Sequence, residues 1–558
     1  MKKAVLIFLF SIFLSIPVVL PFFHEGYFPT HDGEWAVVRL GDMFRTLRDF
    51  QIPPRYSGNL NFSYGYPLFN FTYPFPYYLG TLMHFLGIGF VDTIKILFAG
   101  SVPLSAFFIF LASRNIWKNT WAGIISATLY VYFPYRMVDL YVRGSIGESL
   151  SFALFPLLFY FTIKLIDKPS YFWILGISIS LATLITTHNI MTVLFLPVWI
   201  LFIVSKVILD KKKDSVKTII IGIFLGLGLS AFFWVPAIFE KHLILLSKTP
   251  IADRNLYFVS LDQLILSRWG YGVPTDPNGF SYQLGLPYLI VISLTALVLF
   301  FILFRQKGKL KDSLTKFSLV LISIILFFIF LMTKPSSFLW ESLPLLSEIN
   351  YPWTVLGILG FLTSLSAGFL CKQKITKYIA VVLGLVAVVL VLPYAKPQYY
   401  VDRGDDFYLT NDATTTSSNE LMPLWVKKMP IERPAEKVKV FGQGKVENIS
   451  YNSKQISFSV DLLSQSRIRV NTIYYPGWTA KVNNQNAEIN YANERGLMEF
   501  ELSKGENKVE LKFSETPLRF SAGLISLASF VVLLLYAITA QLRKKFIKAR
   551  TVVSKSDL

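Results

Sequence analysis

The chain has 558 residues, of which 53% are hydrophobic and only 16% charged, and its mean hydropathy is +0.50. This composition excludes a string of soluble domains and predicts a polytopic membrane protein. The formal net charge of +19 raises the question of a nucleic-acid partner. The basic residues instead form short clusters between apolar runs, as the positive-inside rule predicts for cytoplasmic loops. We therefore expect the lipid bilayer as a partner and no nucleic acid.

The first apolar segment spans residues 4–22 and follows Met1-Lys2-Lys3. Under the positive-inside rule its basic start stays in the cytoplasm, so the chain emerges on the opposite, outer face. The residues after it, Pro21-Phe22-Phe23-His24, offer no small-residue cleavage site. We therefore expect a retained first helix rather than a signal peptide.

Windows of about 20 apolar residues predict roughly twelve membrane spans. After the first, they lie near 93–113, 121–135, 149–166, 170–186, 190–209, 217–237, 284–304, 316–332, 351–370, 377–394 and 520–540. The apolar stretch 77–90 is too short for a span, so we expect an interfacial or re-entrant helix there. This topology is that of a multi-pass cell (plasma) membrane protein with both termini cytoplasmic. The long outer loops are then 23–92, 238–283, 333–350 and 395–519.

Residues 395–519 differ in pattern from the rest of the chain. Segments such as 456–461 and 508–513 alternate apolar and polar residues, and Asn-rich and Gly-containing turns lie between such segments. This pattern predicts an extracytoplasmic antiparallel β-sandwich-like domain. The expected domains are a transmembrane domain over 1–394 that includes the first outer loop 23–92, the β domain over 395–519, a last transmembrane helix over 520–540 and a basic cytoplasmic tail over 541–558.

A small polar cluster, His31-Asp32-Gly33-Glu34-Trp35, directly follows the first span. Ionisable groups beside a bilayer are costly unless they are paired or functional, so Asp32 and Glu34 are candidates for catalysis or metal binding. Either carboxylate could accept a proton from an acceptor hydroxyl. The alternative is structural, because Thr30 or Asp32 before Glu34 and Trp35 is also typical of a helix start.

Further ionisable residues lie where other predicted spans reach the outer face. They are Arg136, Asp139, Arg143 and Glu148 between the third and fourth spans, His188 between the fifth and sixth, Glu240 after the seventh, and Arg268 in the next outer loop. The three arginines could bind a phosphate through forked, charge-assisted hydrogen bonds, and the other residues are candidates for substrate contacts. The simpler alternatives are interfacial anchoring and mutual salt bridges, and for His188 a hydrogen-bonded helix end.

The acidic first outer loop, the dozen predicted helices and the outer β domain together resemble the GT-C superfamily of membrane glycosyltransferases. More narrowly, the chain resembles the bacterial membrane family labelled 6-pyruvoyl-tetrahydropterin synthase-related. The residues that carry this resemblance are the 31–35 cluster, the 141–148 stretch, Phe232-Phe233-Trp234-Val235-Pro236-Ala237 and Tyr475-Pro476-Gly477-Trp478. The label implies no pterin chemistry here, because this chain lacks the zinc-binding histidine set of the soluble synthases.

The GT-C resemblance implies an inverting glycosyltransferase that moves a sugar from a polyprenyl-phosphate donor to a cell-envelope glycan, lipid or protein acceptor. The reaction would take place on the non-cytoplasmic face. Carried over onto this sequence, the role of base or metal ligand falls on Asp32, with Glu34 second and His31 tuning or sharing that role. The arginines named above would steady the phosphate, and Mg²⁺ or Mn²⁺ would suit the carboxylate and phosphate oxygens.

One position departs from the family pattern. The Pro-Trp pair near the tenth span is followed by Thr354, where the family carries an arginine. Another cation, such as Arg268 or Lys334, would then have to bind the lipid phosphate. Two interpretations from other classes stay open: a lipid or glycan transporter whose path the same charges line, and a non-catalytic envelope protein whose β domain binds polysaccharide.

Overall fold

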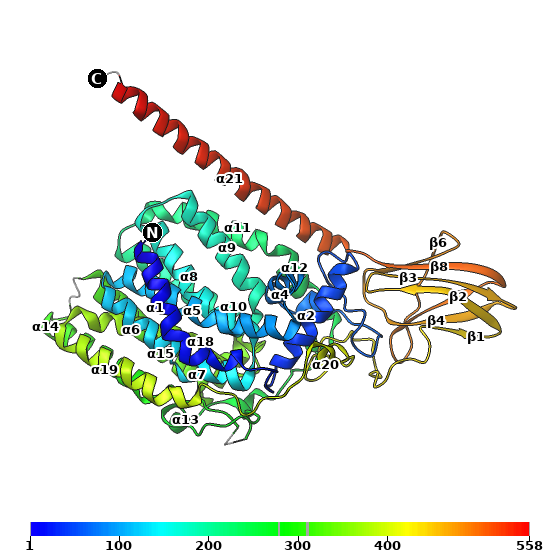
Figure 1. Ribbon diagram of the computed structural model, residues 1–558, viewed down its shortest axis with the longest axis horizontal. Coiled ribbons are helices and arrows are strands. Elements are labelled where there is room, and N and C mark those ends of the chain that lie inside the picture. The colour runs from blue at the N-terminus through cyan, green and yellow to red at the C-terminus, as the bar shows by residue number, and fades with distance from the viewer. Residues whose placement is uncertain (1, 277–278, 309–311, 557–558) are drawn as a thin grey trace.

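The computed structural model describes residues 2–276, 279–308 and 312–556, with side chains of the last helix as far as Thr539. Most of the chain forms a helical bundle, and two antiparallel β-sheets project from one end of it (Figure 1). The predicted fold class, a mostly helical polytopic membrane protein with an antiparallel β domain, is confirmed.

Nine helices in the described part of the chain are long and apolar enough to cross a membrane. They are α1 (Lys2–Val19, continued by a 3-10 turn to Phe23), α5 (Phe90–Trp117), α8 (Ile146–Asp167), α10 (Asn189–Leu209), α14 (Leu286–Arg305), α15 (Ser313–Met332), α18 (Leu356–Ser366, within an apolar run Pro352–Lys372), α19 (Lys374–Val391, continued to Tyr394) and the first part of α21 (Pro517–Ser556). A bent pair, α11 (Val216–Leu229) and α12 (Ala231–Phe239), would make a tenth span.

Two predicted spans are shorter than the others, with 12 and 17 residues. They form α6 (Thr120–Val131) and α9 (Tyr171–Thr187). Helix α6 ends early because Pro134 lacks a backbone N–H and begins a separate short helix, α7 (Pro134–Val138). All twelve predicted apolar segments therefore fall on helices in the described part of the chain. Nine are long and apolar enough to cross a membrane, the bent pair would make a tenth span, and α6 and α9 are shorter apolar helices.

The break between α11 and α12 has a local cause. The two helices meet at an angle of 69° around Ser230. The Ser230 hydroxyl donates to the carbonyl of Gly226 at 2.9 Å, a side-chain bond that competes with the helical ladder and favours a bend. The polar end of α12 is thereby turned toward the first outer loop and the start of α21.

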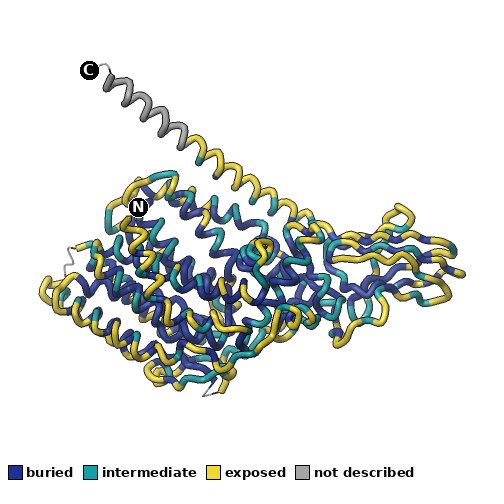
Figure 2. The backbone as a smooth tube through the Cα atoms, in the orientation of Figure 1, coloured by how far each residue is buried: buried dark blue, intermediate teal, exposed yellow. Residues whose placement is uncertain are grey.

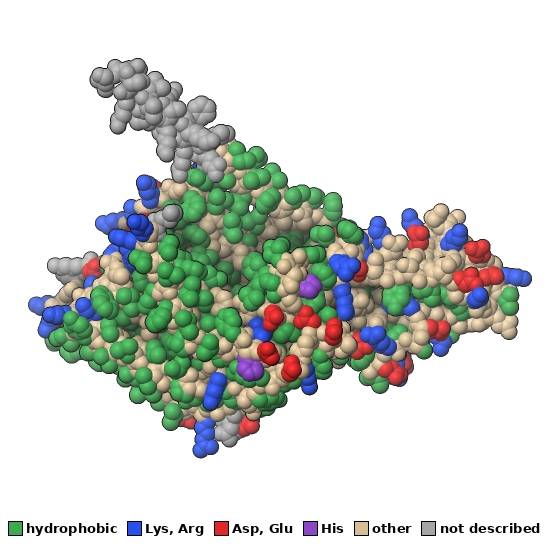
Figure 3. All heavy atoms as spheres, in the orientation of Figure 1, with side chains coloured by type: hydrophobic (Ala, Val, Ile, Leu, Met, Phe, Trp, Pro, Cys, Tyr) green, Lys and Arg blue, Asp and Glu red, His purple; other side chains and the backbone are tan. Residues whose placement is uncertain are grey.

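The surface of the bundle suits a hydrocarbon environment. Outer side chains such as Phe300, Leu385 and Leu527 are exposed, whereas the middle of the bundle is buried (Figure 2). Hydrophobic side chains cover the visible face, and Lys and Arg gather at the end farthest from the strands (Figure 3). This distribution matches spans whose basic ends lie on one side of a membrane.

Shorter helices lie between the long ones along the chain. They are α2 (Gly33–Arg48), α3 (Leu68–Phe71), α4 (Phe75–Phe85), α7, α13 (Leu261–Ile265), α16 (Ser337–Ser342), α17 (Pro344–Ser347) and α20 (Asp405–Leu409). Helix α4, which overlaps the stretch 77–90 where we expected an interfacial or re-entrant helix, has 11 residues and is too short to cross a bilayer. Helix α2 carries the polar cluster at its N-terminus and packs against α4, α5 and α20.

The strands occupy residues 438–513 and form two antiparallel sheets. The smaller has the order β1-β4-β7 (Val438–Phe441, Ser466–Ile473, Leu497–Leu502), and the larger β2-β3-β8-β5-β6 (Gly444–Tyr451, Gln455–Leu462, Gly505–Phe513, Trp478–Val482, Gln485–Ala487). Alternate residues of β3 and β8 are buried, as the sequence alternation predicts. Asn483 and Asn484 both have positive φ, as a two-residue hairpin turn between β5 and β6 requires.

Candidate functional site

The site begins with a backbone connection between two loops that are more than one hundred residues apart in the sequence. The N–H of His31 donates to the carbonyl of Val142 at 3.0 Å, and the N–H of Asp32 donates to that of Arg143 at 2.8 Å. The N–H of Gly33 donates to Thr30 Oγ1 at 2.9 Å. The 31–35 cluster is therefore held directly against the loop that contains Val142 and Arg143.

Gly144 allows this close approach. Its φ of +65° is a conformation that glycine adopts readily and L side chains rarely do. A Cβ at this position would collide with Thr30 Oγ1 and lie 2.8 Å from the backbone N of Gly33. The N–H of Gly144 donates to the carbonyl of Asp139 at 2.8 Å and closes the π-helical turn Asp139–Arg143. A side chain here would push the two loops apart.

Three charged side chains form a row from the surface inward. Arg143 Nη2 lies 3.9 Å from Asp32 Oδ2, and Arg143 Nη1 donates to Glu148 Oε2. The exposed fraction falls along the row from 38% for Asp32 through 13% for Arg143 to 0% for Glu148. Asp32 is thus the open end of the row, and Glu148 at the start of α8 is its buried counter-charge.

Arg143 is held in orientation on several sides. Its Nη1 also donates to the Tyr135 hydroxyl at 3.0 Å, and its guanidinium lies 4.7 Å from the centre of the Trp353 ring. A buried cation paired with a carboxylate and stacked on an aromatic face has little freedom to rotate. No hydrogen bond from Arg143 Nη2 occurs among the described residues, so this nitrogen keeps donor capacity for a ligand.

Several buried polar atoms around this row lack a hydrogen-bond partner within the described chain. They are His31 Nε2, Asp139 Oδ1, Glu148 Oε1 and Trp353 Nε1. Buried polar atoms are ordinarily satisfied, so a group of unsatisfied ones is typical of a site that receives water or a ligand. Burial and the nearby Arg143 lower the pKa of His31 below its usual value, which keeps the ring neutral at pH 7.

Asp32 occupies the N-cap position of α2, but its side chain makes no capping hydrogen bond. Thr30 instead accepts from the helix start, as described above. The structural alternative for Asp32 therefore accounts for its position but not for its carboxylate, which points toward Arg143 instead.

Glu34 lies in the first turn of α2 with different neighbours. Its Oε1 is 4.0 Å from Arg403 Nη1, and burial raises the pKa of the Glu34 carboxyl above its usual value. Arg403 is also stacked 4.0 Å from the Phe407 ring. The two carboxylates of the polar cluster thus face separate cations, Asp32 toward Arg143 and Glu34 toward Arg403.

Arg136 and Asp139 are buried deeper, between α5 and α8. The Arg136 guanidinium donates to the carbonyl of Ser149 at 3.0 Å and to Ser101 Oγ at 2.6 Å, and lies 4.4 Å from the Phe152 ring. Asp139 accepts from the Ser149 hydroxyl. Both side chains are fully buried, and this arrangement joins helices. Arg136 Nε has no hydrogen-bond partner in the described chain, but the guanidinium has no exposed surface at which a phosphate could bind.

His188 caps α10 from the short link after α9. Its Nδ1 accepts from the N–H of Met191 at 3.2 Å, and its ring lies 5.1 Å from that of Tyr73. Tyr73 in turn lies against Gly147, next to Glu148, where a Cβ would come within 2.7 Å of the tyrosine ring. His188 therefore makes the hydrogen bond expected of a helix-end residue, and Tyr73 lies between its ring and the start of α8.

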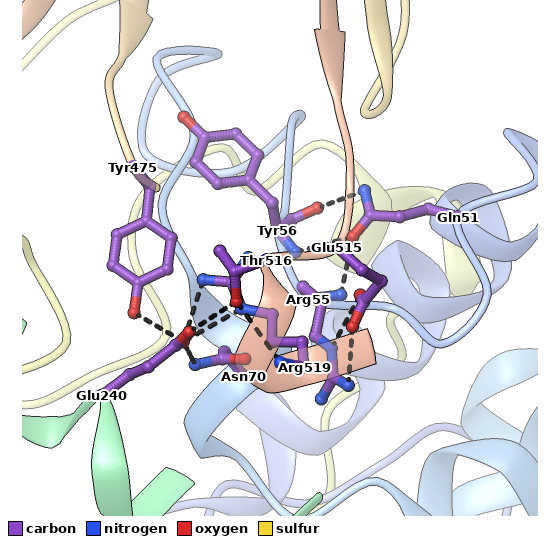
Figure 4. A network of polar contacts seen from close by, with 9 residues as sticks. All are labelled: Gln51, Arg55, Tyr56, Asn70, Glu240, Tyr475, Glu515, Thr516 and Arg519. Atoms are coloured by element: carbon purple, nitrogen blue, oxygen red, sulfur yellow. Dashed lines mark hydrogen bonds and ion pairs between the residues drawn. The ribbon is translucent and has the colours of Figure 1, made fainter. Parts of the chain in front are cut away.

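Glu240 belongs to a separate network at the junction of the bundle and the β domain (Figure 4). Its Oε2 accepts from Arg519 Nε at 3.0 Å and Nη2 at 2.9 Å, from Asn70 Nδ2 at 2.8 Å and from the Tyr475 hydroxyl at 3.3 Å. Its Oε1 accepts from Thr516 Oγ1 at 3.2 Å. These partners come from the first outer loop, the β domain and the start of α21, so Glu240 ties three parts of the protein together.

Arg268 belongs neither to the row of Asp32, Arg143 and Glu148 nor to the Glu240 network. Its side chain is exposed and forms no ion pair within the described ranges.

Sequence analysis also missed two arginines near the polar cluster, Arg39 and Arg403. Arg39 donates to the side chain and carbonyl of Thr415, and it lies four residues after Trp35 and 5.8 Å from its ring. That spacing on a predicted helix was the available signal for Arg39.

Asp32 and Glu34 would need further ligands nearby to hold the predicted Mg²⁺ or Mn²⁺. No group of three or more His, Cys, Asp or Glu side chains that could hold a metal occurs in the part of the chain that the structure describes. Asp32 and Glu34 face different arginines, so these residues do not fit a metal site formed by protein groups alone.

Comparison with known proteins agrees with the family resemblance. The family described as 6-pyruvoyl-tetrahydropterin synthase related domain, membrane protein, matches residues 69–400. The chain belongs to this family. A second family, described as bacterial membrane protein YfhO, matches residues 406–525. The first match includes Arg143, Glu148 and Trp353, whereas Asp32 and Glu34 lie before it.

Two individual proteins are similar over part of the chain. An uncharacterized protein from Lactococcus lactis subsp. cremoris (strain MG1363) is 23% identical over 237 residues, which are 41% of this chain and 39% of that protein. The archaeal oligosaccharyltransferase AglB from Archaeoglobus fulgidus, solved with an inhibitory peptide and a dolichol-phosphate, superposes with a TM-score of 0.40 at 12% identity. That superposition covers 78% of this chain and 62% of the archaeal one.

Proposed function

We propose that this family member transfers a sugar from a polyprenyl-phosphate donor to an acceptor hydroxyl at the membrane face that carries the β domain. The observation that supports this proposal most is the pairing of an exposed carboxylate with a fixed cation. Asp32 is 38% exposed, and Arg143 lies 3.9 Å from it with one nitrogen, Nη2, that makes no hydrogen bond to the described residues. A base and a phosphate-binding group thus lie side by side at the end of a membrane bundle.

The proposed reaction needs one proton acceptor and one group that stabilises the leaving phosphate. The acceptor hydroxyl gives its proton to the Asp32 carboxylate, and its oxygen forms a bond to C1 of the sugar. The bond between C1 and the phosphate oxygen breaks, and its electron pair leaves with the polyprenyl phosphate. Attack from the face opposite the phosphate inverts the configuration at C1, so Asp32 and Arg143, which are 3.9 Å apart here, move apart when the sugar enters between them. Arg143 stabilises the negative charge that develops on the leaving group.

Glu148, Tyr135 and Trp353 act as positioning residues in this scheme. They hold the Arg143 guanidinium through an ion pair, a hydrogen bond and a stacking contact. Because the orientation is set before substrate arrives, little reorganisation is needed during the reaction. Neutral His31, whose buried Nε2 lacks a partner in the described chain, is available for a hydrogen bond with a sugar hydroxyl.

The test is release of polyprenyl phosphate from a panel of polyprenyl-phosphate sugars by the purified protein in lipid discs. Asp32→Asn should abolish turnover while thermal unfolding stays near that of the wild type, because its ion pair is long and partly exposed. Asp92→Asn is the matched control, since Asp92 is an exposed carboxylate paired with Lys95 at the start of α5. Full turnover by Asp32→Asn would overturn the assignment of the base.

The same assay separates this proposal from the transporter and the non-catalytic envelope protein. Donor binding without turnover across a broad acceptor panel would favour those classes. A divalent chelator added to the wild type tests the expected Mg²⁺ or Mn²⁺: loss of turnover that returns with the metal would show that one is required.

A further inference from the structure

A second candidate binding site lies at the opposite end of the bundle, where lysine and arginine side chains gather (Figure 3). A cavity of about 460 Å³ opens there between the last turns of α5, the first residue of α6 and the last turns of α8. Helix α8 starts next to Glu148 and reaches Lys164 in this cavity sixteen residues later. At 1.5 Å per residue the two positions are about 24 Å apart, so they lie near opposite faces of a bilayer.

The lining is positively charged. It includes Arg114, Lys118 and Lys164, and no Asp or Glu. Arg114 and Lys164 form no ion pair among the residues that the structure describes, and Lys118 forms only an exposed one, with Asp167 at 3.4 Å. Exposed pairs of this kind contribute little. The cavity therefore combines three cations with only one weak counter-charge, and this arrangement favours an anion.

The side-chain amides of the lining already donate to backbone carbonyls. Asn115 Nδ2 donates to the carbonyl of Leu111 at 2.6 Å, and Asn119 Nδ2 donates to the carbonyl of Cys371 at 3.3 Å. The cavity also includes Thr120, the first residue of α6, so the positive end of that helix dipole adds to the field of the side chains.

The lining becomes less polar toward the membrane interior. Leu111 lies about one turn before Arg114 on α5, and Tyr160 lies one turn before Lys164 on α8. The Lys164 ammonium is 5.7 Å from the centre of the Tyr160 ring, and both residues line the cavity. A ligand with an anionic head and an apolar tail fits this gradient better than a free anion, because the tail would extend along the apolar surface into the bilayer.

We propose that this cavity binds the phosphate of an anionic phospholipid from the leaflet on the basic side of the protein. Arg114 would hold the phosphate through two nitrogens, and Lys118 and Lys164 would act as point charges beside it. The proposal is independent of glycosyl transfer, because none of these residues is near the Asp32 row.

The experiment measures phospholipid retained by the full-length purified protein in native mass spectrometry, with phosphatidylglycerol and phosphatidylcholine offered in competition. The wild type should retain phosphatidylglycerol selectively. The double variant Arg114→Ala/Lys164→Ala should retain about tenfold less phosphatidylglycerol, or lower still. Each basic side chain near a membrane surface strengthens the binding of an anionic headgroup. Arg114→Lys with native Lys164 keeps the charge and should retain an intermediate amount.

The matched control is Lys211→Ala/Lys212→Ala, which removes two exposed lysines between α10 and α11, outside the cavity. It should retain phosphatidylglycerol as the wild type does. Equal loss in both double variants would overturn the proposal in favour of diffuse surface attraction. Displacement of the lipid by an equimolar amount of inorganic phosphate would overturn it in favour of a free-anion site. Thermal unfolding of each variant shows whether the bundle is intact.

Discussion

Asp32 and Arg143 are joined twice, once through the backbone and once through their side chains. The N–H of Asp32 donates to the carbonyl of Arg143 at 2.8 Å, and the two charged groups approach to 3.9 Å. The backbone bond does not depend on the carboxylate, so the carboxylate can be neutralised without separating the loops. This relationship makes Asp32→Asn an informative variant for the proposed reaction.

Gly144→Ala should lower the thermal stability of the protein and reduce any activity of the outer site. The new Cβ would meet Thr30 Oγ1 in a conformation of positive φ, which costs about 1–3 kcal/mol for a non-glycine residue. Gly404→Ala is the control, because nothing lies within 4 Å of a Cβ there and its φ is negative. Thermal unfolding in detergent micelles compares the two. Equal midpoints would show that the loops tolerate a side chain at Gly144.

Glu148→Gln should destabilise the protein by about 2 kcal/mol, because it removes the buried counter-charge of Arg143 while keeping the shape of the side chain. Asp167 lies on the same helix as Glu148 and forms an exposed ion pair with Lys118. Asp167→Asn removes this pair and should change the stability by less than about 1 kcal/mol. Denaturant or thermal unfolding measures both. An unchanged stability of Glu148→Gln would mean that Asp32 alone compensates the charge of Arg143.

The pKa of His31 should be below 6.5 and should rise when the charge of Arg143 is removed, since burial and that cation both lower it. NMR titration of ring-labelled histidine in lipid discs measures the value in the wild type, in Arg143→Gln and in the charge-keeping Arg143→Lys. Only the glutamine variant should show the rise.

The sign of the stability effect of His31 follows from the same shift. Its folded-state pKa lies below the unfolded value, so the unfolded state binds more protons when the pH falls below about 6.5. This contribution should therefore destabilise the folded protein on acidification and vanish at neutral pH. His31→Gln should remove that part of the pH dependence. An unchanged profile would contradict the burial of a neutral ring.

Glu240→Ala should loosen the junction between the bundle and the β domain, because it leaves the fully buried Arg519 without its carboxylate. We expect a loss of about 3–5 kcal/mol and faster proteolysis between α20 and the first strand. Glu348→Ala, which removes an exposed partner of Lys241, is the control and should behave like the wild type. Proteolysis at the wild-type rate in Glu240→Ala would show that other contacts hold the junction.

The sequence by itself determined the membrane class, the apolar segments and the β pattern, because these follow from local hydropathy and periodicity along the chain. It also indicated Asp32, Arg143 and Glu148 as candidate site residues, because charges at the ends of apolar segments are rare without a partner. The family resemblance drawn from short motifs was confirmed by the match over residues 69–400.

Tertiary structure decided which of those polar residues meet. Asp32, Arg143 and Glu148 form one row, Glu34 faces Arg403, and Glu240 forms a network with Arg519 instead. It also showed that α6 and α9 are shorter than the other predicted spans. Contacts between residues more than one hundred positions apart depend on how helices pack in three dimensions, and hydropathy, which is a local property of the chain, carries no information about that arrangement.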